Sequence, residues 1–152
     1  MIFEIKKAVR EDVPFIENCV EAAYQHYIER MGKRPGPMLD DYAAVVRDHH
    51  VFVVKSDGDD AAAGILVLMR QADTVLLDNV AVHPDYQGQG LGKLLMHKAE
   101  HQAKEWGYDS IILYTHELMT ENQAIYQKLG YIETHRIEEK GFNRVYMRKL
   151  LG

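Results

Sequence analysis

The stretch from residue 75 to residue 95 constrains this chain most, because it joins a strand pattern, a glycine-rich turn and a helix pattern. Its apolar beginning predicts a buried strand, and Pro84 ends that strand because proline cannot donate to a sheet ladder. Gly88, Gly90 and Gly92 allow a tight turn with a bare backbone. A helix is predicted to begin near Gly90, and its first N–H groups have no internal partner. Such a turn before a helix start is a site for phosphate.

Three phosphate-binding motifs compete for this turn. A P-loop requires a serine or threonine after its lysine, whereas Lys93 is followed by Leu94. A dinucleotide fingerprint requires the spacing G-x-G-x-x-G and repeated βα units, and the chain has neither. The pattern Q/R-x-x-G-x-G/A is satisfied at every fixed position from Gln87 to Gly92. A turn whose glycines serve backbone geometry alone is the remaining alternative.

The strand end and the turn together resemble the GNAT superfamily of N-acetyltransferases. The strand ends V-x-V-x-P at residues 80–84, and the Q-x-x-G-x-G turn follows. A second segment, residues 122–131, reads NQAIYQKLGY and is similar to the family's N…A…Y-x-K-L-G-F/Y segment. Residues 30–42 also look like a bacterial subgroup of uncharacterised members, which suggests that this loop builds the acceptor side. The resemblance covers nearly the whole chain.

The predicted elements follow the order β-α-α-β-β-β-α-β-α-β-β, which is the order this family shows. Strand, helix and strand from residue 75 to residue 116 make one βαβ unit, so these two strands are expected to be parallel neighbours. One helix is expected to run from Glu11 to about Gly32. The resemblance implies an α/β (α+β) GNAT fold in a single domain, 1–152, with a mixed twisted sheet of about six or seven strands and about four helices.

Composition narrows the class of protein. With 152 residues, 47% hydrophobic and 27% charged, the chain has the composition of an ordinary globular domain. No apolar run approaches the ~20 residues of a membrane helix, and the N-terminus lacks the features of a signal peptide. A net charge of −5 does not indicate a surface that binds nucleic acid. A single cysteine is compatible with a reducing compartment. We therefore expect a cytoplasmic protein without nucleic-acid or membrane partners.

Two residue types that often mark chemistry are expected to be structural or solvated here. Cys19 shares one helix face with Ile16 and Val20, and this apolar spacing predicts that Cys19 is a core residue rather than a nucleophile. His97 and His101 are one helical turn apart, a spacing that can bind metal. They lie opposite the apolar stripe of their helix, and no H-E-x-x-H pattern is present, so no metal site is predicted.

The resemblance implies how acetyl-coenzyme A would be held. Main-chain N–H groups of the turn would bind its pyrophosphate, and Lys93 in the first helical turn would meet a phosphate. The strand 75–82 and the strand 110–116 would splay apart, leaving a free strand edge for the amide-bearing pantetheine arm. A polar break at Asp78 and Asn79 is the place for the bulge that causes the splay. The predicted cofactor-binding residues are Val80, Ala81, Val82, Gln87, Gly88, Gln89, Gly90, Leu91, Gly92, Lys93 and Asn122.

Two proton transfers accompany direct acetyl transfer to an amine. By the family match, Tyr126 is the predicted general acid, since a phenol with a pKa of about 10 can protonate the leaving thiolate. An amine with a pKa of about 10.4 is mostly protonated at neutral pH, so a base or a water chain is needed. Glu117, at the end of its strand, is the predicted base. The other candidate bases are Asp78, His116 and His83.

The leading hypothesis is an acetyl-coenzyme A-dependent N-acetyltransferase that moves the acetyl group directly to a primary amine. The acceptor is a small-molecule amine or a protein N-terminal or lysine amine. The alternative is a non-catalytic acyl-coenzyme A-binding module of the same fold, because no base is unambiguous. A third reading, a binding domain for another nucleotide, depends on the glycine turn alone. The resemblance also allows a homodimer through the C-terminal strands.

Overall fold

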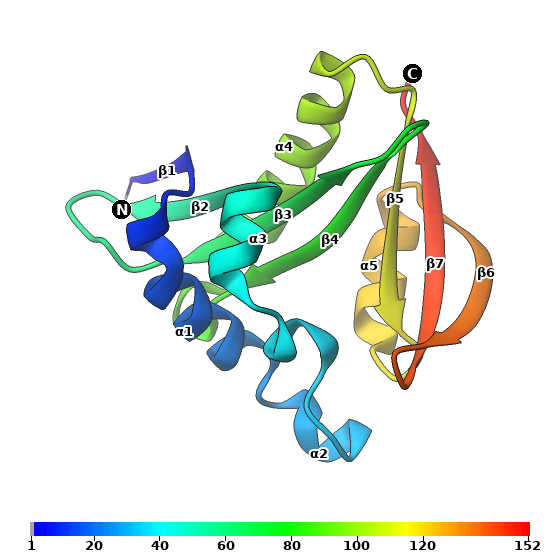
Figure 1. Ribbon diagram of the computed structural model, residues 1–152, viewed down its shortest axis with the longest axis horizontal. Helices are drawn as coiled ribbons and strands as arrows, with labels where there is room; N and C mark the ends of the chain where they lie inside the picture. The colour runs from blue at the N-terminus through cyan, green and yellow to red at the C-terminus, as the bar shows by residue number, and fades with distance from the viewer. Residues whose placement is uncertain (1) are drawn as a thin grey trace.

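The computed structural model describes residues 2–152 and has one mixed β-sheet with helices on both faces (Figure 1). The strands are β1 (Phe3–Lys7), β2 (His50–Ser56), β3 (Gly64–Arg70), β4 (Val75–Val82), β5 (Ser110–His116), β6 (Ile132–Glu139) and β7 (Phe142–Leu150). The α-helices are α1 (Val13–Tyr24), α2 (Tyr27–Met31), α3 (Tyr42–Asp48), α4 (Leu91–Glu105) and α5 (Thr120–Lys128). Short 3-10 turns are η1 (Arg10–Asp12), η2 (Gly36–Leu39) and η3 (Pro84–Tyr86).

The seven strands lie in the order β1-β2-β3-β4-β5-β7-β6. Among the strands within residues 2–152, only β4 and β5 pair in parallel, and the other neighbours are antiparallel. Helix α4 is the crossover between the two parallel strands, which confirms the expected βαβ unit. The mixed sheet and its helices also confirm the expected α/β architecture.

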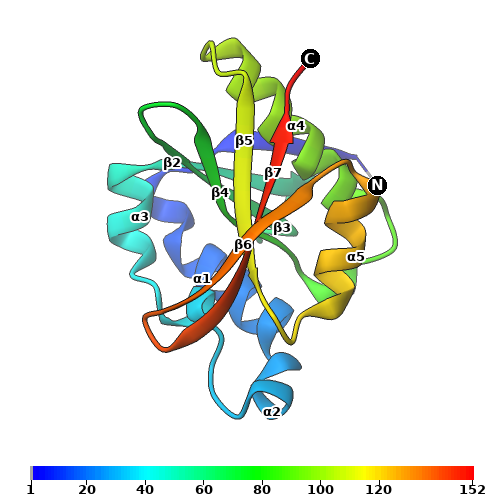
Figure 2. The ribbon, with the colours of Figure 1, turned by 90° about the vertical axis from the view of Figure 1, so that its right-hand side faces the viewer.

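The helices form two layers, with α1 and α3 on one face of the sheet and α4 and α5 on the other (Figure 2). Each layer closes its own apolar core. Cys19 is fully buried in the core beneath α1, and this burial raises the pKa of its thiol to about 12. A thiol in that state is a packing group, as its position in the sequence pattern predicts. None of the helices within residues 2–152 has the length and apolar character to cross a membrane.

The expected single helix up to Gly32 is broken in the structure. Helix α1 ends at Tyr24, and α2 begins three residues later. At the break the Ile28 N–H donates to the Gln25 carbonyl, three residues back, so the chain tightens and changes direction. The rings of Tyr24 and Tyr27, on either side of the break, are both buried, at 8% and 6% exposure.

A β-bulge in β4 determines which side chains reach each face. Asn79 pairs with Val67 of β3, whereas Leu77 pairs with Leu68, so Asp78 is the extra residue. One extra residue reverses the alternation of faces. Leu77 therefore packs in the core under α4, while Asn79 is turned toward α1 and α3. The bulge lies at the polar break in the apolar run, as the family resemblance implies.

The bulge also marks the end of pairing between β4 and β5. Pairing is confined to residues 75–77 of β4 and 111–113 of β5. Beyond these residues β5 stays paired with β7 on its other side. The two strands meet at the top of Figure 1 and diverge toward its lower edge. The expected splay between 75–82 and 110–116 is therefore confirmed.

Candidate functional site

Two cavities open where β4 and β5 diverge. The larger has a volume of about 590 Å³ and lies between the end of β4, the glycine turn, the start of α4 and one face of α5. The smaller has a volume of about 40 Å³ and lies between the bulge, the end of β5, α1 and the η2 loop. Val80, Asn122 and Tyr126 line both cavities, so these residues form the boundary between them.

The larger cavity brings together all but one of the predicted cofactor-binding residues. These are Val80, Ala81, Val82, Gln87, Gly88, Gly90, Leu91, Gly92, Lys93 and Asn122. Gln89 is exposed and does not line the cavity. The sequence reasoning missed further lining residues, namely Tyr86, Met96, Ile125, Lys128 and Leu129. Ile125 is 52% exposed on α5, and an exposed apolar residue can be recognised only once the helix is placed.

The glycine turn has a conformation that favours glycine at two positions. Gly88 and Gly90 have φ angles of 82° and 80°, where an L side chain is strained. A Cβ atom at either position would meet no atom within 4 Å, so the space above the turn is open. Helix α4 begins at Leu91, and its first internal bond is from the Leu94 N–H to the Gly90 carbonyl (3.0 Å). The N–H groups before Leu94 are therefore free to bind an anion.

The end of β4 offers a free strand edge to the larger cavity. The His83 N–H donates to the Ala63 carbonyl (2.8 Å), so the odd-numbered residues after the bulge carry the bonds to β3. The main-chain groups of Val80 and Val82 then point toward the splay. An extended ligand with amide groups fits such an edge, because it pairs as a strand would.

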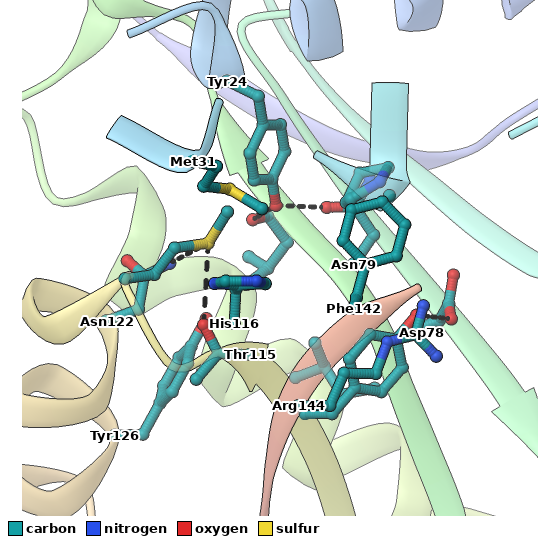
Figure 3. Close-up of a pocket in the computed structure, with 16 residues that line it drawn as sticks. Tyr24, Met31, Asp78, Asn79, Thr115, His116, Asn122, Tyr126, Phe142 and Arg144 are labelled. Carbon is teal, nitrogen blue, oxygen red and sulfur yellow. Dashed lines mark hydrogen bonds between the residues drawn. The ribbon is translucent and has the colours of Figure 1, made fainter. Parts of the chain in front are cut away.

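Tyr126 lies at the junction of the two cavities. Helix α5 presents it there, and its ring packs edge-on against Tyr131 with 6.2 Å between ring centroids. Its hydroxyl forms no hydrogen bond with another residue of the segment 2–152 and points toward the smaller cavity (Figure 3). Burial raises the pKa of Tyr126 above its ordinary value, so the side chain is a neutral phenol at neutral pH.

The smaller cavity has one carboxylate in its wall. Asp78 Oδ1 accepts a hydrogen bond from the Tyr114 hydroxyl (2.7 Å), and no ion pair joins Asp78 to a residue within 2–152. The Arg144 guanidinium lies over the Tyr114 ring at 4.2 Å and is paired with Glu139 (2.9 Å). The positive charge nearest the cavity is thus neutralised by another carboxylate, and Asp78 can take up a cationic or proton-donating group.

The other candidate bases lie in different surroundings. Glu117 does not line either cavity, because its carboxylate accepts from the Asn143 amide (3.1 Å) beside the β6–β7 hairpin. His116 lines the smaller cavity, but its Nδ1 accepts from the Leu118 N–H (3.1 Å), which leaves the proton of the neutral ring on Nε2. Burial lowers the pKa of His116, with Lys33 and Arg144 nearby. His83 lines neither cavity.

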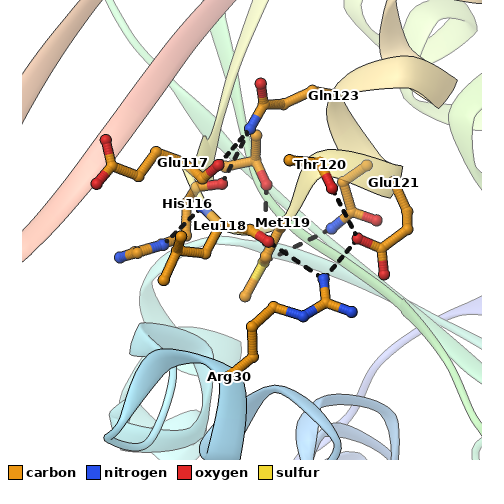
Figure 4. A network of polar contacts seen from close by, with 10 residues as sticks. Arg30, His116, Glu117, Leu118, Met119, Thr120, Glu121 and Gln123 are labelled. Carbon is orange, nitrogen blue, oxygen red and sulfur yellow. Dashed lines mark hydrogen bonds and ion pairs between the residues drawn. The ribbon is translucent and has the colours of Figure 1, made fainter.

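A polar network joins α2 to α5 and the end of β5, next to residues that line the smaller cavity (Figure 4). Arg30 of α2 donates to the Leu118 carbonyl (3.1 Å) and pairs with Glu121 of α5 (2.6 Å). Gln123 of α5 donates to the Glu117 carbonyl (3.0 Å). Lys33, just after α2, donates to the Gly141 carbonyl of the β6–β7 turn. These contacts join α2 and the loop after it to α5 and to the last hairpin.

Within residues 2–152, no group of three or more histidine, cysteine, aspartate or glutamate side chains is placed to hold a metal ion. His97 and His101 both lie on the exposed side of α4. The nearest polar partner of His101 is Glu105, one turn further along the helix at 3.2 Å.

Known proteins resemble the chain at two levels. The chain is 38% identical over 72 residues to one curated relative, the ribosomal protein bS18-alanine N-acetyltransferase of Haemophilus influenzae. The match covers 46% of this chain and 47% of that one, so the chain spans about half the length of the curated relative it matches. Solved structures match over nearly the whole chain at lower identity.

Two solved structures illustrate the shared fold. The ribosomal-protein-S18-alanine N-acetyltransferase of Escherichia coli has a TM-score of 0.79 at 19% identity, covering 99% of this chain and 94% of its own. The PaiA N-acetyltransferase of Thermoplasma acidophilum, solved in complex with coenzyme A, has a TM-score of 0.76 at 19% identity and covers 99% of both chains. The sequence profile of the Acetyltransferase (GNAT) family matches residues 16–131. By this match and by its fold, the chain belongs to the Acetyltransferase (GNAT) family.

Proposed function

We propose that this protein is an acetyl-coenzyme A-dependent N-acetyltransferase that transfers the acetyl group directly to a primary amine. The observation that carries the proposal is the meeting of two cavities at Tyr126, in a chain of this family. One cavity is suited to a long, phosphate-bearing, amide-containing ligand. The other is suited to a small polar group. A direct transfer requires that the two reactants touch, and the shared boundary provides that contact.

The larger cavity supports the choice of cofactor. Free N–H groups at the start of α4 suit a pyrophosphate, and the exposed side chain of Lys93 adds a positive charge. The edge at Val80 and Val82 suits the two amides of a pantetheine arm. The Thermoplasma acidophilum structure was solved with coenzyme A, which supports the same ligand here. An N–H at Val80 would also stabilise the developing negative charge on the thioester oxygen.

The smaller cavity supports roles for two side chains. Tyr126 is the proposed general acid: its neutral phenol would give a proton to the sulfur as the carbon–sulfur bond breaks. Asp78 is the proposed base, because it is the carboxylate of the cavity wall. The amine nitrogen becomes acidic as its bond to carbon forms, and Asp78 would accept that proton. Glu117 remains the alternative base, acting through water from its neighbouring cavity.

The acceptor is proposed as a primary amine, on a small molecule or on a protein N-terminus or lysine. A cavity of about 40 Å³ holds the reacting nitrogen and its nearest atoms, and the rest of the acceptor would lie outside it. The name of the Haemophilus influenzae relative, which refers to an alanine of a ribosomal protein, favours a protein terminus as one arm of a test.

Calorimetric titration with acetyl-coenzyme A, beside ATP and NAD, tests the cofactor. Thioester consumption is then measured with ethylamine, alaninamide, spermidine, a lysine peptide and a peptide that begins with alanine. Selective binding of acetyl-coenzyme A and amine-dependent release of coenzyme A are expected. Binding without consumption of the thioester by any amine would instead support the non-catalytic acyl-coenzyme A-binding module. The absence of Glu117 from the two cavities that meet at Tyr126 favours this alternative.

A further inference from the structure

A chain of buried hydrogen bonds runs from the η2 loop to the wall of the smaller cavity. The Tyr42 hydroxyl donates to the Pro37 carbonyl (2.6 Å), and Asn79 Nδ2 donates to the Tyr42 oxygen (3.0 Å). The Tyr24 hydroxyl donates to Asn79 Oδ1 (2.7 Å). The three side chains are 3% to 8% exposed, and they come from α3, β4 and α1. The chain exists because the bulge turns Asn79 toward these helices.

The Pro37 carbonyl, at one end of this chain, determines the donor and the acceptor in every hydrogen bond that follows. The Pro37 carbonyl has no proton, so Tyr42 must donate to it. The Tyr42 oxygen is then an acceptor, which fixes the amide of Asn79 with its NH₂ group toward Tyr42. The Asn79 oxygen consequently faces Tyr24 and must receive a proton from it. The proton of Tyr24 is thereby held away from the cavity.

Tyr24 lines the smaller cavity from the side opposite to Tyr126 (Figure 3). Its single proton is donated to Asn79, and its oxygen also lies 3.3 Å from the Val80 carbonyl oxygen. Burial raises the pKa of Tyr24 well above its ordinary value, so the side chain does not ionise at neutral pH. What the hydroxyl offers to the cavity is therefore a neutral oxygen with a lone pair, which only accepts hydrogen bonds.

We infer that Tyr24 binds the acceptor amine by accepting a hydrogen bond from one of its N–H groups, and that Asn79 and Tyr42 are positioning residues that keep the hydroxyl proton of Tyr24 turned away from the cavity. The inference deepens the proposed function and rests on it for the identity of the ligand. A primary amine or ammonium is complementary to such an oxygen. A group without a proton is excluded, because its lone pair would face another lone pair.

The test compares two small probes of the same shape. Alaninamide carries an amine where isobutyramide carries a methyl group. Binding of each to the full-length protein, with coenzyme A present, is measured by NMR titration, so no turnover is required. The wild type is expected to bind alaninamide at least about tenfold more tightly than isobutyramide.

Three variants decide the inference. Tyr24→Phe is expected to reduce the alaninamide preference by about tenfold while leaving isobutyramide binding within about twofold. Tyr42→Phe, remote from the cavity, is expected to reduce the preference in the same direction, because the Asn79 amide is then free to turn. Tyr27→Phe is the control, since Tyr27 is a largely buried tyrosine whose hydroxyl forms no hydrogen bond within residues 2–152. Using a ratio of two probes separates this effect from general loss of structure.

An equal ratio in wild type and Tyr24→Phe would overturn the inference, as would a wild type without preference for the amine. Neither result depends on catalysis. If thioester consumption occurs while the ratio is unchanged, only the inference fails. If the ratio falls as expected while no amine consumes the thioester, the proposed function fails and the binding role of Tyr24 stands.

Discussion

The two cavities meet at Tyr126 but are built in different ways. The larger is formed mainly by one continuous stretch, from Val80 to Met96, and offers main-chain groups to a ligand. The smaller collects side chains from α1, the η2 loop, β4, β5, α5 and β7. Main-chain sites tolerate changes of side chain but not of backbone conformation. The predictions below use this difference, with the largest expected effect first.

A backbone change should destroy the larger site. Gly90→Val places a β-branched residue at a φ of 80°, so the turn must rearrange and the N–H groups at the start of α4 lose their direction. Loss of two hydrogen bonds to a phosphate corresponds to about 1,000-fold weaker binding of acetyl-coenzyme A. Calorimetry measures this dissociation constant.

The matched control is Gly58→Val, between β2 and β3. Gly58 has a φ of 75° and, like Gly90, open space around its Cβ position. A similar loss of thermal stability with unchanged cofactor binding is expected. Comparable weakening of cofactor binding in both variants would show that general destabilisation, rather than the turn, is responsible.

A side-chain change should disable the smaller site while leaving the larger intact. Asp78→Asn keeps an oxygen for the Tyr114 hydroxyl but cannot take a proton, so turnover should fall by about 100-fold at unchanged affinity for acetyl-coenzyme A. Glu117→Gln, in the neighbouring cavity, should change turnover by less than about twofold. Steady-state kinetics with the best amine of the panel compares them. The reverse order of effects would assign the base to Glu117.

Tyr126 belongs to both sites, and removal of its hydroxyl should affect only the chemical step. Tyr126→Phe is expected to reduce turnover at least about tenfold, with cofactor binding unchanged. Tyr131→Phe is the control, because Tyr131 packs against Tyr126 and its buried hydroxyl has no hydrogen-bond partner within residues 2–152. Single-turnover measurements show whether chemistry limits the rate. Equal rates for wild type and Tyr126→Phe, with chemistry limiting, would remove Tyr126 from the mechanism.

The same difference between the two cavities explains how much of each site can be predicted from the sequence. The glycine turn is local, and its residue types follow directly from its backbone angles, so the larger site can be predicted almost completely. The bulge is visible as a polar break, but which face Asn79 takes depends on the extra residue. No local sequence pattern indicates the roles of Tyr24 and Tyr42, because these roles arise only when α1 and α3 pack on the sheet. Similarly, the contact with Asn143 that holds Glu117 away from the cavity joins residues 26 positions apart.

The smallest expected effect concerns charge beside the smaller cavity. Partial desolvation and the nearby carboxylate of Asp78 raise the pKa of Asp40 from 3.8 to about 6, although Lys140 and Arg144 oppose the shift. Between pH 4 and pH 6 the folded protein therefore binds more protons at Asp40 than the unfolded chain does. Its contribution to stability is present below this range and is lost as pH rises through it.

Asp40→Asn removes this dependence. Relative to wild type, the variant should gain stability between pH 4.5 and pH 7.5, by less than about 1 kcal/mol because the Asp40 side chain is exposed and water screens it. Urea unfolding at the two pH values measures the difference, and Asp60→Asn, at an exposed site between β2 and β3, is the control. The same pH dependence of stability in both variants would mean that Asp78 does not raise the pKa of Asp40. A gain confined to Asp40→Asn would show that carboxylates are crowded on the acceptor side, where an incoming ammonium would relieve their repulsion.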